Sequence, residues 1–318
     1  MNRLRLVFCG TPQFAVPALQ KLLSLSEFEI LAVFTQPDRP RGRGRQVTFS
    51  PVKEVALAAN LPVRQPGRIR APEVEEQLRV LAPDAVIIIA YGQIIPVRFL
   101  TIPKLGWINL HASLLPQYRG AAPIAWAMAN GETRTGNTSM RIDAGMDTGE
   151  MLLQEELPIL PDETAPELTA RLAQAGAPLI VETLRELALG NLRGRAQDNS
   201  AATYAPILKR EDGLIDWQRP AQEIYNRIRG FTPWPGAYTE FRGQTCHVWG
   251  RPAAPESSPH SPGTISHTGG GVVIACGAAT VLELTHVKIE GRKQVTAAEF
   301  ANGARLQSEE HFGKRDLR

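Results

Sequence analysis

The most constraining feature of the sequence is a run of six apolar residues at positions 85–90, Ala-Val-Ile-Ile-Ile-Ala. β-Branched residues favour strands, and a strand without polar residues is stable only when both of its faces are buried. Such strands occur in parallel sheets that are covered by helices on both sides. The run is far too short to span a membrane. It therefore predicts an α/β fold.

The first half of the chain alternates between strand-like and helix-like segments, as an α/β sheet with helices on both faces requires. Short apolar segments predict further strands at 4–9, 28–34 and 106–110. Apolar residues at helical spacing predict helices at 14–25, 51–60, 73–81 and 162–189. We expect the last helix to break near Gly176-Ala177-Pro178, because proline disrupts a helix interior.

The second half follows a different pattern. Short strand-like segments separated by Gly, Pro and Ser clusters lie at 237–241, 245–249, 263–267, 271–276 and 279–289. Short strands with frequent turns are typical of a small β-barrel. The 318 residues suggest two domains at about 150 residues each. We expect a catalytic domain over 1–189, a polar linker over 190–208 and a barrel domain over 209–318.

Composition excludes several classes of protein. Apolar residues make up 43% of the chain and charged residues 21%, so a largely disordered or fibrous chain is excluded. The net charge of +3 permits a polyanionic partner without requiring one. Cys9, Cys246 and Cys276 are too far apart for a zinc cluster or a disulfide framework, which suits a reducing compartment. With no signal-peptide pattern, we expect a cytoplasmic protein.

Three polar residues are candidates for chemistry. Asn109 and His111 are two apart on a predicted strand, so their side chains face the same way at its carboxyl end, where α/β sheets bind ligands. Asp147 follows in a loop rich in Asp and Gly. Taken singly, these residues are better explained by a packed histidine at a strand end and by an ordinary turn. No cluster of His or Cys supports a metal site.

Together these segments resemble the folate-dependent formyltransferases. Asn-Leu-His-x-Ser-Leu-Leu-Pro at 109–116 resembles the Asn/His signature and folate loop of that family, and Asp-x-Gly-x-Asp-x-Gly at 143–149 resembles its catalytic-aspartate loop. The resemblance covers nearly the whole chain and is weakest in the last eighty residues or so. Further segments resemble the branch of this family that acts on methionyl-tRNA. They lie at 8–15, 35–44, 51–53, 90–92, 119–123, 215–217 and 233–235.

The resemblance implies a Rossmann-like formyltransferase domain followed by an OB-fold-like β-barrel. It places Asn109, His111 and Asp147 on the catalytic trio, and Asp143 on a structural position. Folate would bind at two turns, formed by Ser113, Leu114, Leu115 and Pro116 and by Ile89, Ala90 and Tyr91. The acceptor arm of tRNA would meet Arg43 in a basic loop, flanked by Arg41 and Arg45.

The reaction so implied moves a formyl group from 10-formyltetrahydrofolate to the amine of initiator methionyl-tRNA. Asn109 and a protonated His111 would stabilise the developing oxyanion, and Asp147 would pair with His111 or accept a proton. We expect a monomer with no metal and no membrane partner.

Three rival functions are weighed. A dinucleotide-binding dehydrogenase is rejected because the first turn, residues 9–13, holds one glycine where the fingerprint needs three. A non-catalytic tRNA-binding protein would not need the trio. A formyltransferase for a sugar nucleotide or another small amine stays open, because the site motifs are shared.

Overall fold

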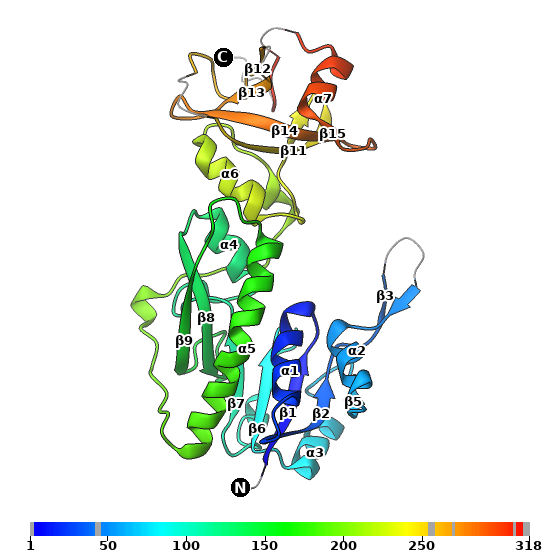
Figure 1. Ribbon diagram of the computed structural model, residues 1–318, viewed down its shortest axis with the longest axis vertical. Coiled ribbons are helices and arrows are strands. Elements are labelled where there is room, and N and C mark those ends of the chain that lie inside the picture. The colour runs from blue at the N-terminus through cyan, green and yellow to red at the C-terminus, as the bar shows by residue number, and fades with distance from the viewer. Residues whose placement is uncertain (1–2, 42–45, 254–257, 269–270, 308–309, 314–318) are drawn as a thin grey trace. The chain divides into compact units, whose positions relative to one another are not determined.

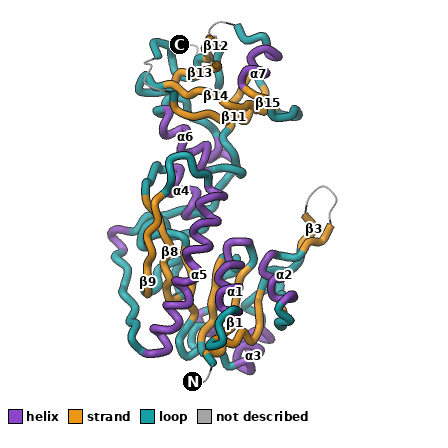
Figure 2. The backbone as a smooth tube through the Cα atoms, in the orientation of Figure 1, coloured by secondary structure: helices purple, strands orange, loops and turns teal. Residues whose placement is uncertain are grey.

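The computed structural model describes residues 3–41, 46–253, 258–268, 271–307 and 310–313. The chain divides into two compact units, which are followed element by element in Figure 1 and by backbone type in Figure 2. The first unit comprises Met1–Pro123, Arg134–Pro158 and Glu167–Ala205. The second comprises Ile124–Thr133, Ile159–Pro166 and Pro206–Arg318.

A seven-stranded sheet in the order β5-β2-β1-β6-β7-β8-β9 forms the centre of the first unit. The first five strands in this order are parallel, and β8 and β9 are antiparallel to their neighbours. The strands are β1 (Leu4–Gly10), β2 (Phe28–Phe34), β5 (Val63–Arg64), β6 (Ala85–Ile89), β7 (Trp107–His111), β8 (Arg134–Arg141) and β9 (Met151–Pro158). The predicted parallel sheet around residues 85–90 is confirmed.

Helices cover both faces of this sheet, so alternate strand residues enter two different cores. On β1, Leu6 and Phe8 pack with α1, α2 and α5, whereas Val7 and Cys9 pack with α3. This arrangement confirms the Rossmann-like fold. The helices of this unit are η1 (Gln13–Ala15), α1 (Val16–Leu23), α2 (Pro51–Ala58), α3 (Pro72–Leu81), η2 (Val97–Phe99), η3 (Asn199–Ala201) and most of α5 (Ala165–Leu189).

Strands β8 and β9 have no counterpart in the sequence-based prediction. Strand β8 is buried along most of its length, yet it carries Asn137, Thr138 and Ser139. The Asn137 amide donates to Leu172 O at 2.8 Å, and Thr138 Oγ1 donates to Ser113 O at 2.7 Å. Because hydrogen bonding offsets the cost of burying these polar groups, the strand has no apolar pattern that a sequence search could detect.

Helix α5 is continuous through Pro178, so the predicted break near residues 176–178 is wrong. The glycine in that stretch serves packing instead. A Cβ on Gly176 would lie 2.5 Å from Leu110 Cδ2, so any larger residue there would require the Leu110 side chain to shift. The long helix thereby supports the strand that carries Asn109 and His111.

The second unit contains a curled antiparallel sheet in the order β10-β11-β14-β13-β12, with β15 paired to β14. Its apolar core is closed by α6 and α7, which confirms the predicted OB-like domain. The strands are β10 (Tyr238–Phe241), β11 (Gln244–Pro252), β12 (Ile265–Thr268), β13 (Gly271–Ala275), β14 (Val281–Ile289) and β15 (Val295–Thr296). The helices are α4 (Pro123–Ala129), η4 (Arg210–Gly213), α6 (Ala221–Gly230) and α7 (Ala297–Ala304).

The segment predicted as a linker, 190–208, is largely part of the first unit, which extends to Ala205. Arg195 pairs with Met151 at the start of β9, and Tyr204 pairs with Arg119. Figure 1 shows the segment running back beside β9. The segment is polar because it makes hydrogen bonds to the catalytic domain, and polarity alone does not distinguish such a segment from a linker.

Candidate active site

His111 ends β7 at the carboxyl edge of the parallel strands and faces Asp147. Its side chain is 7% exposed and that of Asp147 is 19% exposed, so the pair is largely removed from water. His111 Nδ1 lies 3.7 Å from Asp147 Oδ2, and Nε2 lies 2.9 Å from Tyr118 O. The fold thus brings His111 and Asp147 close together although they are 36 positions apart in the sequence.

The contact to Tyr118 decides the roles of the two ring nitrogens of His111. A carbonyl oxygen can only accept, so Nε2 carries a proton and donates to Tyr118 O. Nδ1 is then the nitrogen that gains or loses a proton, and it faces the Asp147 carboxylate. At 3.7 Å the two groups are beyond hydrogen-bond distance.

Asn109 lies two residues before His111 on the same strand and is half-buried. Its backbone is opposite Ile88 of β6 and Met140 of β8, so the ladder on both sides fixes its position. Within the described residues its side-chain amide makes no hydrogen bond. Since a buried or half-buried amide is normally bonded, Asn109 offers a free donor and acceptor beside His111.

The loop between β8 and β9 holds Asp147 in a left-handed conformation, with a φ of 55°. Asp143 shapes the loop by accepting from Gly145 N at 3.0 Å and from Thr148 Oγ1 at 2.8 Å. Gly120 N donates to Asp147 Oδ2 at 2.8 Å and orients the carboxylate. Left-handed backbone is uncommon for a residue other than glycine, and its presence here indicates a conformation imposed by surrounding contacts.

At the two predicted folate-binding turns, the groups open to a ligand are mainly those of the backbone. In 113–116, Ser113 Oγ donates to Gln117 O at 2.6 Å, and the Leu115 side chain is buried against Met140 and Met151. Gln154 Nε2 donates to Leu115 O at 2.9 Å, which holds the turn against β9. Leu114 and Pro116 are half-buried, so their side chains remain accessible.

The second turn follows β6. Ile89 and Tyr91 point into the two cores, whereas Ala90 is exposed and has a φ of 46°. The Tyr91 hydroxyl is buried without a hydrogen-bond partner among the described residues, and burial raises the pKa of this side chain above its usual range. The Tyr91 carbonyl accepts from Gln36 Nε2 at 3.0 Å. An apolar ligand at this turn would meet Ala90 and backbone groups.

Of the predicted tRNA-binding arginines, Arg41 ends β3 (Arg39–Arg41), which pairs with β4 (Gln46–Thr48). Arg43 and Arg45 lie outside the described residues, and of Arg41 only the backbone is described. We call β3 and β4 together the arginine hairpin, and side chains at its base contact one another. Lys53 donates to Asp38 and to Gln65 Oε1, and the hydrogen bond from Lys53 holds the pKa of the Asp38 carboxyl below its usual range.

Comparison with known proteins identifies the family. The family described as Formyl transferase matches residues 3–184, and the one described as Formyl transferase, C-terminal domain, matches residues 207–305. The chain belongs to the formyl transferase family. A methionyl-tRNA formyltransferase of Solibacter usitatus is 52% identical over 314 residues, covering 99% of this chain and 100% of the relative. That of Koribacter versatilis is 51% identical, covering 97% and 98%.

Solved formyl transferases share the fold at much lower identity. The N-formyltransferase from Helicobacter canadensis, solved with folinic acid and dTDP-3-aminofucose, has a TM-score of 0.64 at 19% identity and covers 89% of this chain and 99% of its own. No group of three or more His, Cys, Asp or Glu residues in the described ranges could hold a metal ion. Likewise, no helix in those ranges is long and apolar enough to cross a membrane.

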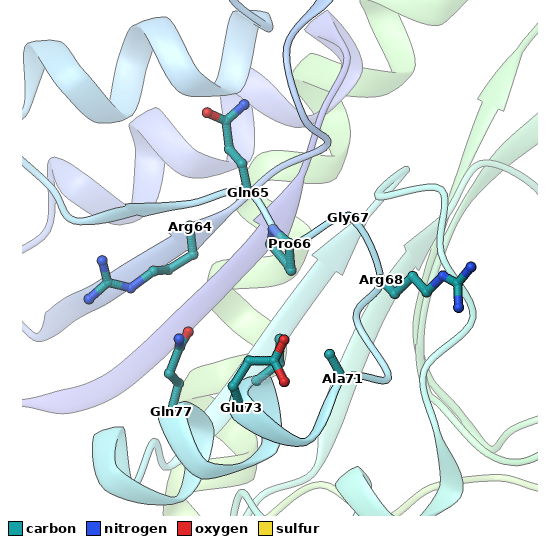
Figure 3. A pocket seen from close by; sticks show the side chains of 9 residues that line it. Arg64, Gln65, Pro66, Gly67, Arg68, Ala71, Glu73 and Gln77 are labelled. Carbon is teal, nitrogen blue, oxygen red and sulfur yellow. The ribbon is translucent and has the colours of Figure 1, made fainter.

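A pocket of about 570 Å³ lies at the carboxyl end of β5, between the loop after that strand and the start of α3. Figure 3 shows Glu73 and Gln77 on α3 facing Pro66, with Arg64 and Arg68 on opposite sides. None of the residues predicted for catalysis, folate or tRNA lines this pocket. It is therefore separate from the candidate trio of this formyl transferase.

Sequence reasoning missed several residues that hold the site together. Gln197 and Thr203 contact the loops at Asp147 and Tyr118 from 50 and 85 positions away, and Arg119 enters the sequence analysis only within the resembling segment 119–123. Nothing in the local sequence around these residues marks such contacts. Only their positions in the folded chain reveal them.

Proposed function

We propose that this formyl transferase moves the formyl group of 10-formyltetrahydrofolate to the free amino group of initiator methionyl-tRNA, for translation initiation. The observation that carries the proposal is the placement of Asn109, His111 and Asp147 at one edge of the sheet. It occurs in a chain 52% identical to a methionyl-tRNA formyltransferase over its whole length, the second unit included.

The proposed roles of the trio follow from their free atoms. The attacking amine needs no strong base, because an α-amino group has a pKa of about 7.7–8.0 and is partly neutral near pH 7. The Asn109 amide would donate to the formyl oxygen as negative charge develops there. As the amine attacks the formyl carbon and the bond from that carbon to N10 of the folate breaks, the proton lost by the amine would pass to Asp147 or to Nδ1 of His111, and one of them would supply the proton that N10 takes up. Gly120 N orients the Asp147 carboxylate for this step.

The folate would lie against the two turns after β6 and β7. The exposed Ala90 and the half-buried Leu114 and Pro116 leave room for a flat apolar ring, and the turns provide backbone groups for its polar edge. The bound folate supplies the formyl group to be transferred. Ser113, Leu115 and Tyr91, which were predicted as contacts, would act through their backbone, because their side chains bond or pack internally.

The acceptor tRNA would meet the arginine hairpin and the OB-like unit. We propose that Arg43, with Arg41 and Arg45, positions the acceptor end, since arginine suits phosphate contacts. The hairpin follows the carboxyl end of β2 in the chain. Residues of the second unit would contact the phosphate backbone. We further propose that the enzyme acts as a monomer in the cytoplasm, where translation begins.

A sugar-nucleotide amine is the alternative acceptor, because the fold is shared with a structure solved with an amino-sugar nucleotide. One assay separates the two. The chain is incubated with 10-formyltetrahydrofolate and, in parallel, with methionyl initiator tRNA, free methionine or a dTDP-amino sugar. We expect product with methionyl-tRNA alone. Transfer to the amino sugar with none to tRNA would overturn the proposal, and tRNA binding without transfer would favour the non-catalytic alternative.

A further inference from the structure

The segment from 190 to 205, which precedes the second unit in the chain, makes direct contacts to the catalytic loop. Gln197 is half-buried, and its Nε2 donates to Asp147 O and to Gly149 O, each at 2.8 Å. A single amide group therefore connects the backbone on both sides of Thr148. Because Asp147 has a sparsely populated left-handed φ, these hydrogen bonds oppose relaxation of the loop.

The same segment contacts the loop that partners His111. Thr203 Oγ1 accepts from Tyr118 N at 2.8 Å, and Tyr118 O is the acceptor of His111 Nε2. The backbone of Arg119 bonds to Thr203 O and to Ala205 N on either side. Both members of the His111–Asp147 pair are thus positioned from one segment.

Arg119 joins the two contacts. Its side chain is 2% exposed, and it has no carboxylate partner among the described residues. Nε donates to Gln197 Oε1 at 3.0 Å and Nη2 donates to Asn199 Oδ1 at 2.9 Å. A buried guanidinium requires acceptors, so Arg119 fixes the Gln197 amide with its oxygen towards itself and its nitrogen towards the catalytic loop.

We propose that Gln197 is a positioning residue for formyl transfer, held in orientation by Arg119, which fixes the Asp147 carboxylate relative to His111. The proposal rests on the proposed function, because it assigns the geometry of the same trio. Asp147 is held twice, at its carbonyl by Gln197 and at its carboxylate by Gly120 N. Loss of the first contact would let the loop relax and move the carboxylate from its place near Nδ1.

The test compares Gln197→Ala with Asp198→Ala in the full chain. Asp198 is the adjacent residue and is exposed, and its side chain accepts from Ser200 N and Oγ within its own segment. Among the described residues no hydrogen bond or ion pair joins its side chain to the loop that holds Asp147, so its loss loosens the segment without touching that loop. Gln197→Ala should lower kcat by roughly 10- to 100-fold, because a displacement of about 1 Å in a reacting group is that costly. The KM of Gln197→Ala for the formyl donor should stay within about threefold of the wild-type value. The kcat of Asp198→Ala should stay within about twofold of the wild-type value.

A second variant and a double-mutant cycle separate positioning from folding. Gln197→Glu keeps an acceptor for Arg119 but removes the donor to the two carbonyls, so it should fold and still be slow. In an Asp147→Asn background, Gln197→Ala should lower kcat by less than about a further twofold, because the carboxylate that Gln197 positions is gone. A merely structural residue would cost the same factor in both backgrounds.

Equal losses for Gln197→Ala and Asp198→Ala, or additive effects with Asp147→Asn, would overturn the positioning role. A wild-type activity from Gln197→Glu would overturn it too. These outcomes require an active wild-type chain. Failure of the proposed function is distinct, since it appears as absence of formyl-methionyl-tRNA from the wild type itself.

Discussion

Two polar networks lie along the carboxyl edge of the same parallel sheet, and they use their side chains differently. Beside β2 and β5, Lys53 bonds directly to Asp38 and Gln65, and Gln65 bonds onward to Gln36 O. Beside β7, His111 Nδ1 and Asp147 remain 3.7 Å apart, and the Asn109 amide has no partner among the described residues. A network whose groups bond to one another holds a segment in place. One that leaves donors and acceptors free is suited to a substrate.

The two networks also differ in how they are held. At the base of the arginine hairpin, the side chains themselves form the contacts, so their loss acts locally. At the trio, support comes from Gln197 and Thr203 through the backbone of two loops. His111 Nδ1 and the Asn109 amide therefore have no hydrogen-bond partner among the described residues, while Gly120 N holds the Asp147 carboxylate. Substitutions beside β7 should therefore lower the turnover number, whereas substitutions at the base of the arginine hairpin should loosen that hairpin. The following experiments test this contrast.

The largest effect is expected at the trio. Asn109→Ala, His111→Ala and Asp147→Asn should each lower kcat by about 10²-fold or more, because each removes a group that acts on developing charge or a moving proton. Steady-state kinetics of formyl transfer measures this. The effects should be non-additive when combined, since the residues act as a unit.

The exposed Asn302→Ala on α7 is the matched control for Asn109→Ala and should leave kcat unchanged. Thermal unfolding of Asn109→Ala should stay close to that of the wild type, because its amide has no partner among the described residues. His111→Ala should unfold at a lower temperature, because it removes a buried side chain and its hydrogen bond to Tyr118 O. Near-normal turnover of Asp147→Asn at saturating substrates would contradict the distinction drawn between the two networks.

A smaller effect is expected from Lys53→Met at the base of the hairpin. Loss of the ammonium leaves Asp38 without its cation, so the hairpin should loosen and KM for methionyl-tRNA should rise several-fold. KM for the formyl donor should change little. Lys21→Met, on the exposed side of α1, is the control for loss of a surface lysine. An equal rise in KM for both substrates would show that Lys53 supports the trio as well.

The pH dependence of this variant has a definite sign. The pKa of Asp38 is lowered in the folded chain, so the stabilising contact exists when the carboxylate is charged. Its contribution is present above the unfolded pKa of about 3.9 and is lost as the pH falls through the lower folded value. The stability difference between the wild type and Lys53→Met should therefore be present at pH 7 and shrink in strong acid.

The smallest effect is expected at the three cysteines, which are buried in apolar cores away from both networks. Cys9 on β1 is fully buried, as are Cys246 and Cys276 in the second unit. Burial raises the pKa of Cys246 and of Cys276 to about 12, and that of Cys9 further. A thiol-alkylating reagent should label none of them in the native chain at pH 7, whereas all three should react in denaturant. Fast native labelling of Cys9 would show that the site edge opens to solvent.

How far the sequence predicts the structure depends on the kind of contact. The apolar run at 85–90 and the two-residue spacing of Asn109 and His111 are local patterns, and the structure confirms the strands they predict. Helix α5 was predicted at nearly its observed length, but Pro178 did not break it. Strand β8 was missed because its buried residues are polar and are satisfied by partners elsewhere in the chain.

The sequence by itself predicted the α/β sheet and the OB-like second unit, and it named the three residues of the candidate trio. These depend on burial patterns with a fixed period along the chain and on contiguous motifs. The tertiary structure alone decided which nitrogen of His111 faces Asp147, and that Gln197 and Arg119 support the catalytic loop. Hydrogen bonds between residues 50 or more positions apart have no local signature, because their geometry exists only after the backbone has folded.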